Sequence, residues 1–436
     1  MQTVTGFSKF SKQEKIDYLV NEFFASSSHT TDLLKSFWHP NQDHQKIFDE
    51  FSENTLTNFY SPYGVVPNFL LNGKLFCLPM VIEESSVVAA CARTAKFWLE
   101  RGGFSAEVID TEKVGQVHFS WAGNKEKLFS YFTEIKNELL DEIKPAMTRM
   151  EKRGGGILSL ELRDKTDLEE NYYQLYCTFN TCDAMGANFI NSVLEILGEK
   201  IKQKVDRAFS EDNLTVIMCI LSNYTPNCRV KASVFCPIEK LSDKSLEMSA
   251  EQFAFKFAQA VKISKIDVHR AVTHNKGIFN GIDAIVLATG NDFRAIEACG
   301  HAFAARDGTY KGLSDISLQN GNFSFSLELP LAMGTVGGLT SLHPLAKFSL
   351  DMLGQPEAKE LMQVTAAIGL AQNFAALRSL VTSGIQKGHM KMHLMNILNH
   401  LGANQFEREK AHEYLQDKII SFNAVREFVG GLRNYQ

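Results

Sequence analysis

The sequence predicts an α+β protein in which a small domain is inserted into a larger one. Strand-like and helical patterns alternate between about residues 108 and 222, which is typical of a separate α+β unit. Longer helical patterns and a hairpin signal lie on either side of this region. The chain has 436 residues, of which 44% are hydrophobic and 22% charged, so it can form an ordered core.

The N-terminal part begins with helices and continues into strands. Ser11 and Glu14 form a capping-box pattern that opens an amphipathic helix. Residues 53–84 mix Gly, Pro and Asn with short apolar runs, as loops and strands do, and a helical pattern then resumes. A long helix is predicted over 125–144, and it should end at Pro145 because proline disrupts a helix interior.

The inserted unit and a hairpin follow. After the glycines of "RGGGI", two strand-like segments lead to a helix that starts near Asp183, and "LTVIMCIL" is typical of a further strand. Asn320 and Gly321 separate alternating apolar residues, which predicts a β-hairpin. The C-terminal part is helical, and a break at "SGIQKGH" predicts a small mobile module at the end.

Charge and composition argue against several classes of protein. The formal net charge is −5 and the basic residues are scattered, so we expect no nucleic-acid partner. The N-terminus lacks the apolar core of a signal peptide, and no segment approaches the roughly 18 uninterrupted apolar residues of a membrane span. Eight cysteines without a CxxC pair indicate reduced thiols. We therefore expect a soluble, cytoplasmic protein.

The stretch "THNKGIFNGI" places polar side chains in an otherwise apolar region. Thr273, Lys276 and Asn280 lie within eight residues of one another, and polar groups in such a region are costly unless they are paired or used. A lysine held there could donate to a developing oxyanion. The alternative is a helix cap with Lys276 pointing to water, and composition alone does not decide between the two.

Two acidic segments could accompany this lysine. In "TGNDFRA", Asp292 precedes a helix, where capping is the simpler interpretation. The preceding apolar run nevertheless brings it near Lys276, and a lysine–carboxylate pair would tune both pKa values. Glu83 and Glu84 precede another apolar helix, where the helix dipole favours carboxylates. One of them could instead serve as a proton donor in a pocket.

Three further segments give weaker signals. "CDAMGANFI" sets Asp183 and small residues at the start of a helix, where a phosphate can bind, but it is not a GxGxxG fingerprint. "MGTVGGLTSLHPLA" lacks the ending of a P-loop, so ATP chemistry is not supported. His389 and His393 lie four apart, but no HExxH glutamate or third ligand accompanies them. A general-acid histidine in a movable segment fits this pattern better than a metal site.

Together these segments resemble the hydroxymethylglutaryl-coenzyme A (HMG-CoA) reductase family. In length and sequence pattern the chain resembles the soluble bacterial class II branch of this family. The matching stretches are "ENTLTNFYSPYGVVPNFLLNG", "LPMVIEESSVVAA", "DAMGAN", "THNKGIFNGI", "LATGNDFRAIEA", "GTVGGLTSLHPLA" and "GIQKGHMKMH", in the family's order. The resemblance assigns the family's four catalytic groups to Glu84, Lys276, Asp292 and His389. It implies that the substrate binds near Ser86, Arg270, Thr273 and Asn280. It implies that the dinucleotide, NADH or NADPH, binds near Asp183, Met185, Gly186, Asn188 and Asn223.

The resemblance also implies an organisation and a reaction. It implies a large HMG-CoA-binding and dimerisation domain, a small ferredoxin-like NAD(P)-binding domain and a C-terminal helical flap, which would cover 1–107 with 223–383, 108–222, and 384–436, respectively. The implied reaction converts HMG-CoA to mevalonate and CoA in two hydride transfers, in a homodimer or higher homo-oligomer with the site between subunits.

The chain departs from the family pattern at a few positions. "ENTLTN" lacks the glycine of the family's "ENVIG", Ser8 stands where a basic residue can meet the CoA phosphate, and Met395 stands where a basic residue is common. Two alternatives remain open. A non-catalytic CoA-binding paralogue would be expected to lose one of the four catalytic residues, and none is lost. A metal-dependent hydrolase would have to be built on His389 and His393.

Overall fold

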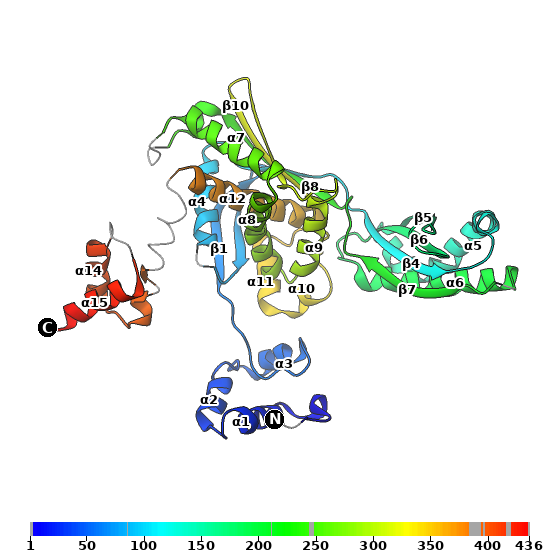
Figure 1. Ribbon diagram of the computed structural model, residues 1–436, viewed down its shortest axis with the longest axis horizontal. Coiled ribbons are helices and arrows are strands. Elements are labelled where there is room, and N and C mark those ends of the chain that lie inside the picture. Colours follow the sequence, from blue (N-terminus) through cyan, green and yellow to red (C-terminus); the bar gives the residue numbers. More distant parts are fainter. Residues whose placement is uncertain are drawn as a thin grey trace.

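In the part of the chain that the structure describes, three antiparallel sheets organise the fold and helices pack around them (Figure 1). The computed structural model describes residues 3–84, 86–210, 212–243, 248–382, 394–395, 397–415 and 420–434. Two of the sheets belong to the large domain and the third forms the small one. The predicted α+β class is thereby confirmed.

The large domain contains a hairpin and a four-stranded sheet. The hairpin pairs β1 (Tyr63–Leu71) with β2 (Lys74–Val81). The sheet has the order β3 (Ser105–Val108), β8 (Arg229–Pro237), β10 (Asn322–Pro330), β9 (Ser314–Gln319). Positive φ angles at Asn320 and Gly321 close the β9–β10 turn, which confirms the predicted hairpin. Val108, at the end of β3, pairs with Val230 in this sheet.

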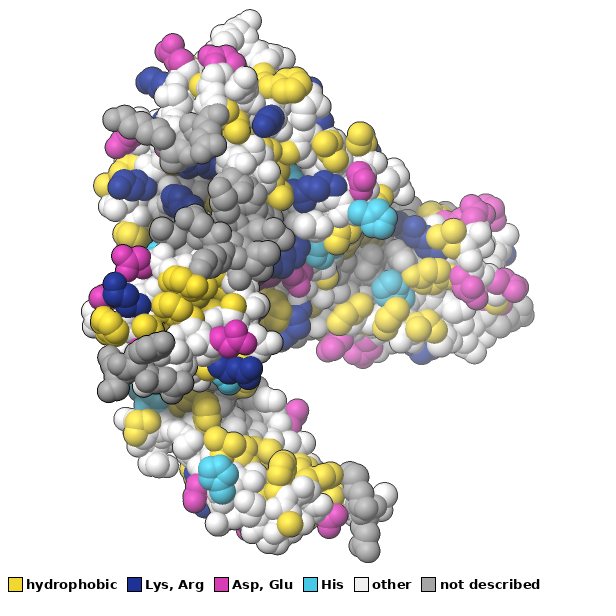
Figure 2. All heavy atoms as spheres, turned by 60° about the vertical axis from the view of Figure 1, so that its left-hand side comes forward, with side chains coloured by type: hydrophobic (Ala, Val, Ile, Leu, Met, Phe, Trp, Pro, Cys, Tyr) yellow, Lys and Arg dark blue, Asp and Glu magenta, His cyan; other side chains and the backbone are white. Residues whose placement is uncertain are grey.

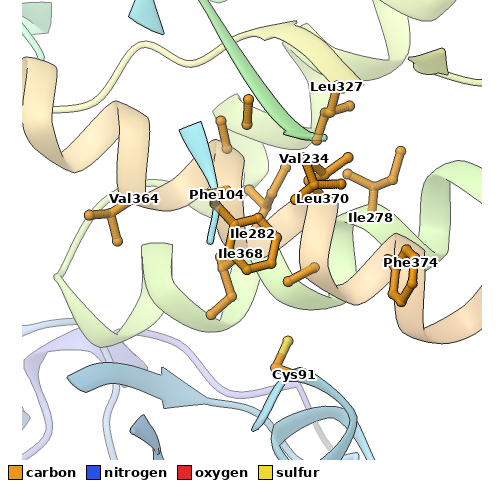
Figure 3. Close-up of a cluster of buried hydrophobic side chains, with 14 of the residues drawn as sticks. Cys91, Phe104, Val234, Ile278, Ile282, Leu327, Val364, Ile368, Leu370 and Phe374 are labelled. Atoms are coloured by element: carbon orange, nitrogen blue, oxygen red, sulfur yellow. The ribbon is translucent and has the colours of Figure 1, made fainter. Parts of the chain in front are cut away.

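The helices of the large domain are α4 (Val87–Leu99), η2 (Ile238–Leu241), α7 (Ala250–Ile266), α8 (Val268–Ala288), α9 (Phe293–Ala304), α10 (Leu339–Leu342), α11 (Pro344–Met352) and α12 (Ala358–Val381). The central one is α12, which packs against α8, α4 and the sheet. Figure 3 shows Ile368 and Phe374 of α12 packed among Ile278, Ile282 and other core residues. Truncating a fully buried phenylalanine such as Phe374 typically costs about 3–5 kcal/mol. By length and composition α12 could cross a membrane, but 67% of its most apolar window is buried, as in a core helix of a soluble protein.

The small domain follows a βαββαβ order. Its elements are β4 (Lys113–Ser120), α5 (Lys125–Glu151), β5 (Gly156–Asp164), β6 (Tyr172–Asn180), α6 (Ala187–Ala208) and β7 (Thr215–Ser222). The sheet order β5-β6-β4-β7 is that of a ferredoxin-like unit. The prediction that its first helix ends at Pro145 was wrong, because α5 continues past this proline. Met147 and Met150 extend the buried face of α5 beyond Pro145, and their burial offsets the lost backbone hydrogen bond.

Short helices lie at both ends of the chain. The N-terminal ones are η1 (Phe7–Lys9), α1 (Lys12–Phe23), α2 (Ser28–Ser36) and α3 (Gln42–Glu50), and the C-terminal ones are α14 (Gln405–Leu415) and α15 (Phe422–Asn434). The predicted capping box of Ser11 and Glu14 is present at α1. The N-terminal helices stand apart from the β1–β2 hairpin and the β3-β8-β10-β9 sheet (Figure 1). They reach the large domain through the rings of Phe48 and Phe51, which contact His343.

Candidate active site

Lys276 and Glu84 form an ion pair between two distant parts of the chain. The Lys276 Nζ atom lies 2.9 Å from the Glu84 Oε2 atom. Lys276 lies inside α8, so the helix cap of the alternative interpretation was wrong, but its side chain points to water as that alternative expected. The side chains are 62% and 35% exposed, respectively, and such pairs contribute about 0–1 kcal/mol to stability. This pair therefore stabilises the fold little and leaves both groups accessible to a ligand.

The Glu84 carboxylate has two more polar neighbours. Glu84 follows β2 and stands just before the N-cap of α4, Ser86. The Ser86 hydroxyl lies 3.5 Å from Glu84 Oε1, and Asn280 Nδ2 lies 3.5 Å from Oε2. Both distances are at the limit for a hydrogen bond, so these contacts are weak. The structure thus brings together four predicted site residues from two segments of the chain.

One face of α8 carries the other predicted substrate contacts. Thr273, Lys276 and Asn280 are spaced by three and four residues, which places them on the same side of the helix. The Thr273 hydroxyl donates to the His269 carbonyl oxygen at 3.1 Å. Arg270 is partly buried, and this burial lowers the pKa of its guanidinium. The helix therefore presents a hydroxyl, an ammonium and an amide in a row beside Glu84.

Asp292 caps α9, as the simpler interpretation predicted. Its Oδ1 atom accepts hydrogen bonds from the backbone N–H groups of Arg294 at 3.1 Å and Ala295 at 3.2 Å. Its Oδ2 atom lies 3.2 Å from Arg294 Nη2. Within the described part of the chain no ion pair joins Asp292 to Lys276. A catalytic role for Asp292 stays a prediction.

A buried polar network lies directly behind Lys276. The His274 Nε2–H group donates to Ser314 Oγ at 2.6 Å, and the Ser314 hydroxyl donates to Asn373 Oδ1 at 2.9 Å. Asn373 Nδ2 donates back to the His274 carbonyl oxygen at 3.4 Å. Burial, together with the charges of Arg270 and Lys265, lowers the pKa of His274 to about 3. The network ties α8 to β9 and α12 by neutral hydrogen bonds, so it fixes the helix that carries Lys276.

The predicted dinucleotide residues cluster around the start of α6. Gly186 is its N-cap with φ 97°, and no side chain caps this end, so the first N–H groups of the helix have no side-chain acceptor. A Cβ atom on Gly186 would lie 2.4 Å from the Thr181 side chain, so only glycine fits. Met185 and Asn223 line one small cavity together with Ala295 and Cys299 of α9. The uncapped start of α6 is compatible with an anionic group, whereas the adjoining cavity is small and mostly apolar.

Asp183 links the two domains. Its Oδ1 atom accepts from the backbone N–H of Ala358, at the first turn of α12, at 2.8 Å. Its carbonyl oxygen accepts from Thr335 N–H at 2.8 Å. The neighbouring Gly334 N–H donates to Asn291 Oδ1 at 2.9 Å. The segment around Gly334 and Thr335 therefore contacts both the turn that precedes α6 and the residue before Asp292, a connection that the sequence did not reveal.

His389 and His393 lie outside the described residues. The eight cysteines are free thiols. In the described ranges no group of three or more His, Cys, Asp or Glu side chains could hold a metal ion.

Comparison with known proteins identifies the family. The family model of hydroxymethylglutaryl-coenzyme A reductase matches residues 13–394. A 3-hydroxy-3-methylglutaryl-coenzyme A reductase from Archaeoglobus fulgidus is 34% identical over 433 residues, covering 99% of this chain and 95% of that protein. A solved reductase structure from Streptococcus pneumoniae is 36% identical with a TM-score of 0.73, covering 99% of this chain and 100% of that one. A class II reductase structure from the same organism, bound to NADPH in open conformations, is 38% identical with a TM-score of 0.72, covering 87% of this chain and 100% of that one. The chain therefore belongs to the hydroxymethylglutaryl-coenzyme A reductase family.

Proposed function

We propose that this protein interconverts HMG-CoA and mevalonate plus CoA, with NADH or NADPH as the hydride carrier. The observation that carries the proposal is the Lys276–Glu84 pair, with Asn280 and Ser86 beside the same carboxylate. Reduction of a carbonyl needs a cation, a proton donor and neutral hydrogen-bonding groups close together. Family membership supplies the substrate class.

Each charged group has a role in this proposal. Reduction places negative charge on the former carbonyl oxygen, and the Lys276 ammonium stabilises that charge. Glu84 delivers a proton at the aldehyde stage. Because Glu84 and Lys276 are in contact, both can act on the same oxygen atom of the substrate. Asp292 would hold Lys276 during the reaction, which requires it to exchange its contact with Arg294.

The small domain would hold the dinucleotide. The uncapped start of α6 fits the pyrophosphate. Asp183, Met185 and Gly186 precede this helix and Asn188 lies in its first turn, whereas Asn223 lines the adjoining small cavity with Met185. When bound, the nicotinamide supplies the hydride chemistry. The contribution of the chain is to orient the cofactor and to exclude water.

His389 is proposed to protonate the CoA thiolate as it leaves. This role rests on the family motif "GHM" and on the ability of histidine to titrate near neutral pH. His389→Ala should slow turnover of HMG-CoA and spare the reduction of free mevaldehyde, because only the first reaction releases a thiolate. Equal loss of both activities would contradict the assignment.

We further propose a cytoplasmic homodimer with the site between subunits. Large apolar side chains are exposed on α8, α10 and α11, including Val272, Leu287, Leu342 and Phe348. Figure 2 shows hydrophobic side chains in patches on one face of the molecule, with basic and acidic side chains interspersed. Exposed apolar surface of this kind favours association with a second copy. Sedimentation of the purified protein would test the assembly.

The decisive experiment mixes purified protein with HMG-CoA and either NADH or NADPH. The loss of near-ultraviolet absorbance measures oxidation of the cofactor. Oxidation of one cofactor, together with release of the free thiol of CoA, would support the reductase and identify the cofactor. A folded protein that is silent with both cofactors, and also with mevalonate, CoA and the oxidised cofactors, would favour the non-catalytic CoA-binding paralogue.

A further inference from the structure

A buried lysine lies beneath the dinucleotide turn. Lys113 is the first residue of β4 and is 4% exposed. It occupies the same side of the strand as Gly115 and Val117, which face α6 and the core of the small domain. A lysine in this row is unusual, because a buried ammonium loses its hydration and gains nothing unless it is paired. Burial lowers the pKa of Lys113 accordingly.

Both hydrogen bonds of Lys113 go to one turn. Its Nζ atom donates to Thr181 Oγ1 at 2.5 Å and to the Ala184 carbonyl oxygen at 2.9 Å. The Thr181 hydroxyl donates to the same Ala184 oxygen at 2.7 Å. Across the described residues, no carboxylate lies within ion-pair distance of Lys113. The Lys113 ammonium therefore hydrogen-bonds to the turn and does not form a salt bridge with any described residue.

The turn held by Lys113 has little freedom to adopt another shape. Cys182 and Gly186 have positive φ angles of 49° and 97°, and αL backbone at a cysteine is strained. A strained turn persists only when its surroundings hold it. From the other side, Gly334 packs so closely that a Cβ atom there would lie 2.4 Å from the Met185 nitrogen. Lys113 also lines the small cavity that contains Met185 and Asn223.

We infer that Lys113 is a positioning residue for the dinucleotide, which holds the turn from Thr181 to Gly186 in its cofactor-accepting shape. The inference rests on the proposed function of this turn. Lys113 acts through the backbone of Ala184 and the hydroxyl of Thr181. Without the ammonium, the turn can relax and the first N–H groups of α6 lose their alignment with the cofactor.

The test compares Lys113→Met with a matched control. Methionine keeps much of the length and removes the donor. We expect the KM for the reduced dinucleotide to rise by about tenfold or more, while kcat and the KM for HMG-CoA change by less than about twofold. The control is Lys202→Met on α6 of the same domain, which removes an ion pair with Asp206 and a bond to the Leu214 carbonyl. It should leave all three parameters near the wild-type values.

A second pair of variants decides the matter if Lys113→Met does not fold. Thr181→Val removes the hydroxyl that connects Lys113 to Ala184, and Thr181→Ser keeps it. The valine variant should raise the dinucleotide KM and the serine variant should restore it. An unchanged dinucleotide KM in Lys113→Met or in Thr181→Val would overturn the inference, as would an equal rise in the KM for HMG-CoA.

The same series separates this inference from the proposed function. If the wild-type protein shows no turnover, the affinity for NADPH and NADH can be measured directly by titration calorimetry. Weaker dinucleotide binding by Lys113→Met, with unchanged binding by Lys202→Met, would support the positioning role even in a protein that reduces nothing. Equal affinity in wild type and Lys113→Met would refute it.

Discussion

Acidification should destabilise this protein through His274. The imidazole is buried, and its Nε2–H group already donates to Ser314. The added proton would go to Nδ1, a buried atom with no hydrogen-bond partner among the described residues. Arg270 and Lys265 add unfavourable positive charge nearby. Protonation therefore favours the unfolded chain, in which the imidazole is free to be hydrated.

The size of the effect follows from the two pKa values. The folded pKa of His274 is lowered to about 3, and an unfolded histidine titrates near about 6.5. The stabilisation is complete above the unfolded pKa and is lost as the pH falls below it, because the unfolded state then binds more protons. The slope approaches about 1.4 kcal/mol per pH unit between the two values. From about pH 7.5 to about pH 5, the loss is about 2 kcal/mol.

Urea unfolding of the wild type and of His274→Gln at these two pH values measures this loss. Glutamine can still donate to Ser314, so the variant should be less stable at neutral pH by only a modest amount, and its stability should fall by about 2 kcal/mol less on acidification. His29→Gln, at an exposed position on α2, should keep the full wild-type pH dependence. A His274→Gln variant with the same pH dependence as the wild type would refute the reasoning.

Three other substitutions test the site. Lys276→Ala should keep the fold and lower kcat by about two to three orders of magnitude, because it removes the cation for the oxyanion; near-normal turnover would contradict that role. Glu84→Gln should depress the reduction of free mevaldehyde by about 100-fold or more, and an unaffected aldehyde step would mean that another group supplies the proton. Gly334→Ala should raise the dinucleotide KM and lower Tm, because its Cβ atom would lie 2.4 Å from the backbone nitrogen of Met185. Gly430→Ala, which meets nothing within 4 Å, is the control, and similar behaviour of the two would refute the packing argument.

Local patterns predicted the elements well where short-range chemistry decides them. The capping box at Ser11 and the Asn320–Gly321 hairpin depend on neighbouring residues, and both were confirmed. Pro145 shows the limit of such reasoning. The rule that proline ends a helix considers one hydrogen bond and one steric contact, whereas the buried methionines of the next turn outweigh both.

The site was predictable to a different degree for each residue. The composition of "THNKGIFNGI" did not decide whether Lys276 is a helix cap or a catalytic cation. The family resemblance grouped Lys276 with Glu84, and the structure shows that the two side chains meet although they are 192 positions apart in the chain. Lys113 was missed, although its place in a core-facing row of β4 was a readable signal. The contact between Asp183 and α12 could not have been predicted, because it joins backbone and side-chain atoms 175 positions apart.

Two hydrogen bonds at the junction of the two sheets connect the proposed dinucleotide turn, Thr181 to Gly186, with the residue before Asp292. Gly334 donates to Asn291, and the next residue, Thr335, donates to Asp183 in the dinucleotide turn. The turn and the residue before Asp292 are therefore joined through one short segment, Gly334 and Thr335. The Asp292–Arg294 pair is mostly exposed, with side chains 41% and 74% accessible, and contributes about 0–1 kcal/mol. Loss of this pair would therefore cost the fold little, whereas the Asp292 Oδ1 atom is also held by the backbone N–H groups of Arg294 and Ala295 at the start of α9.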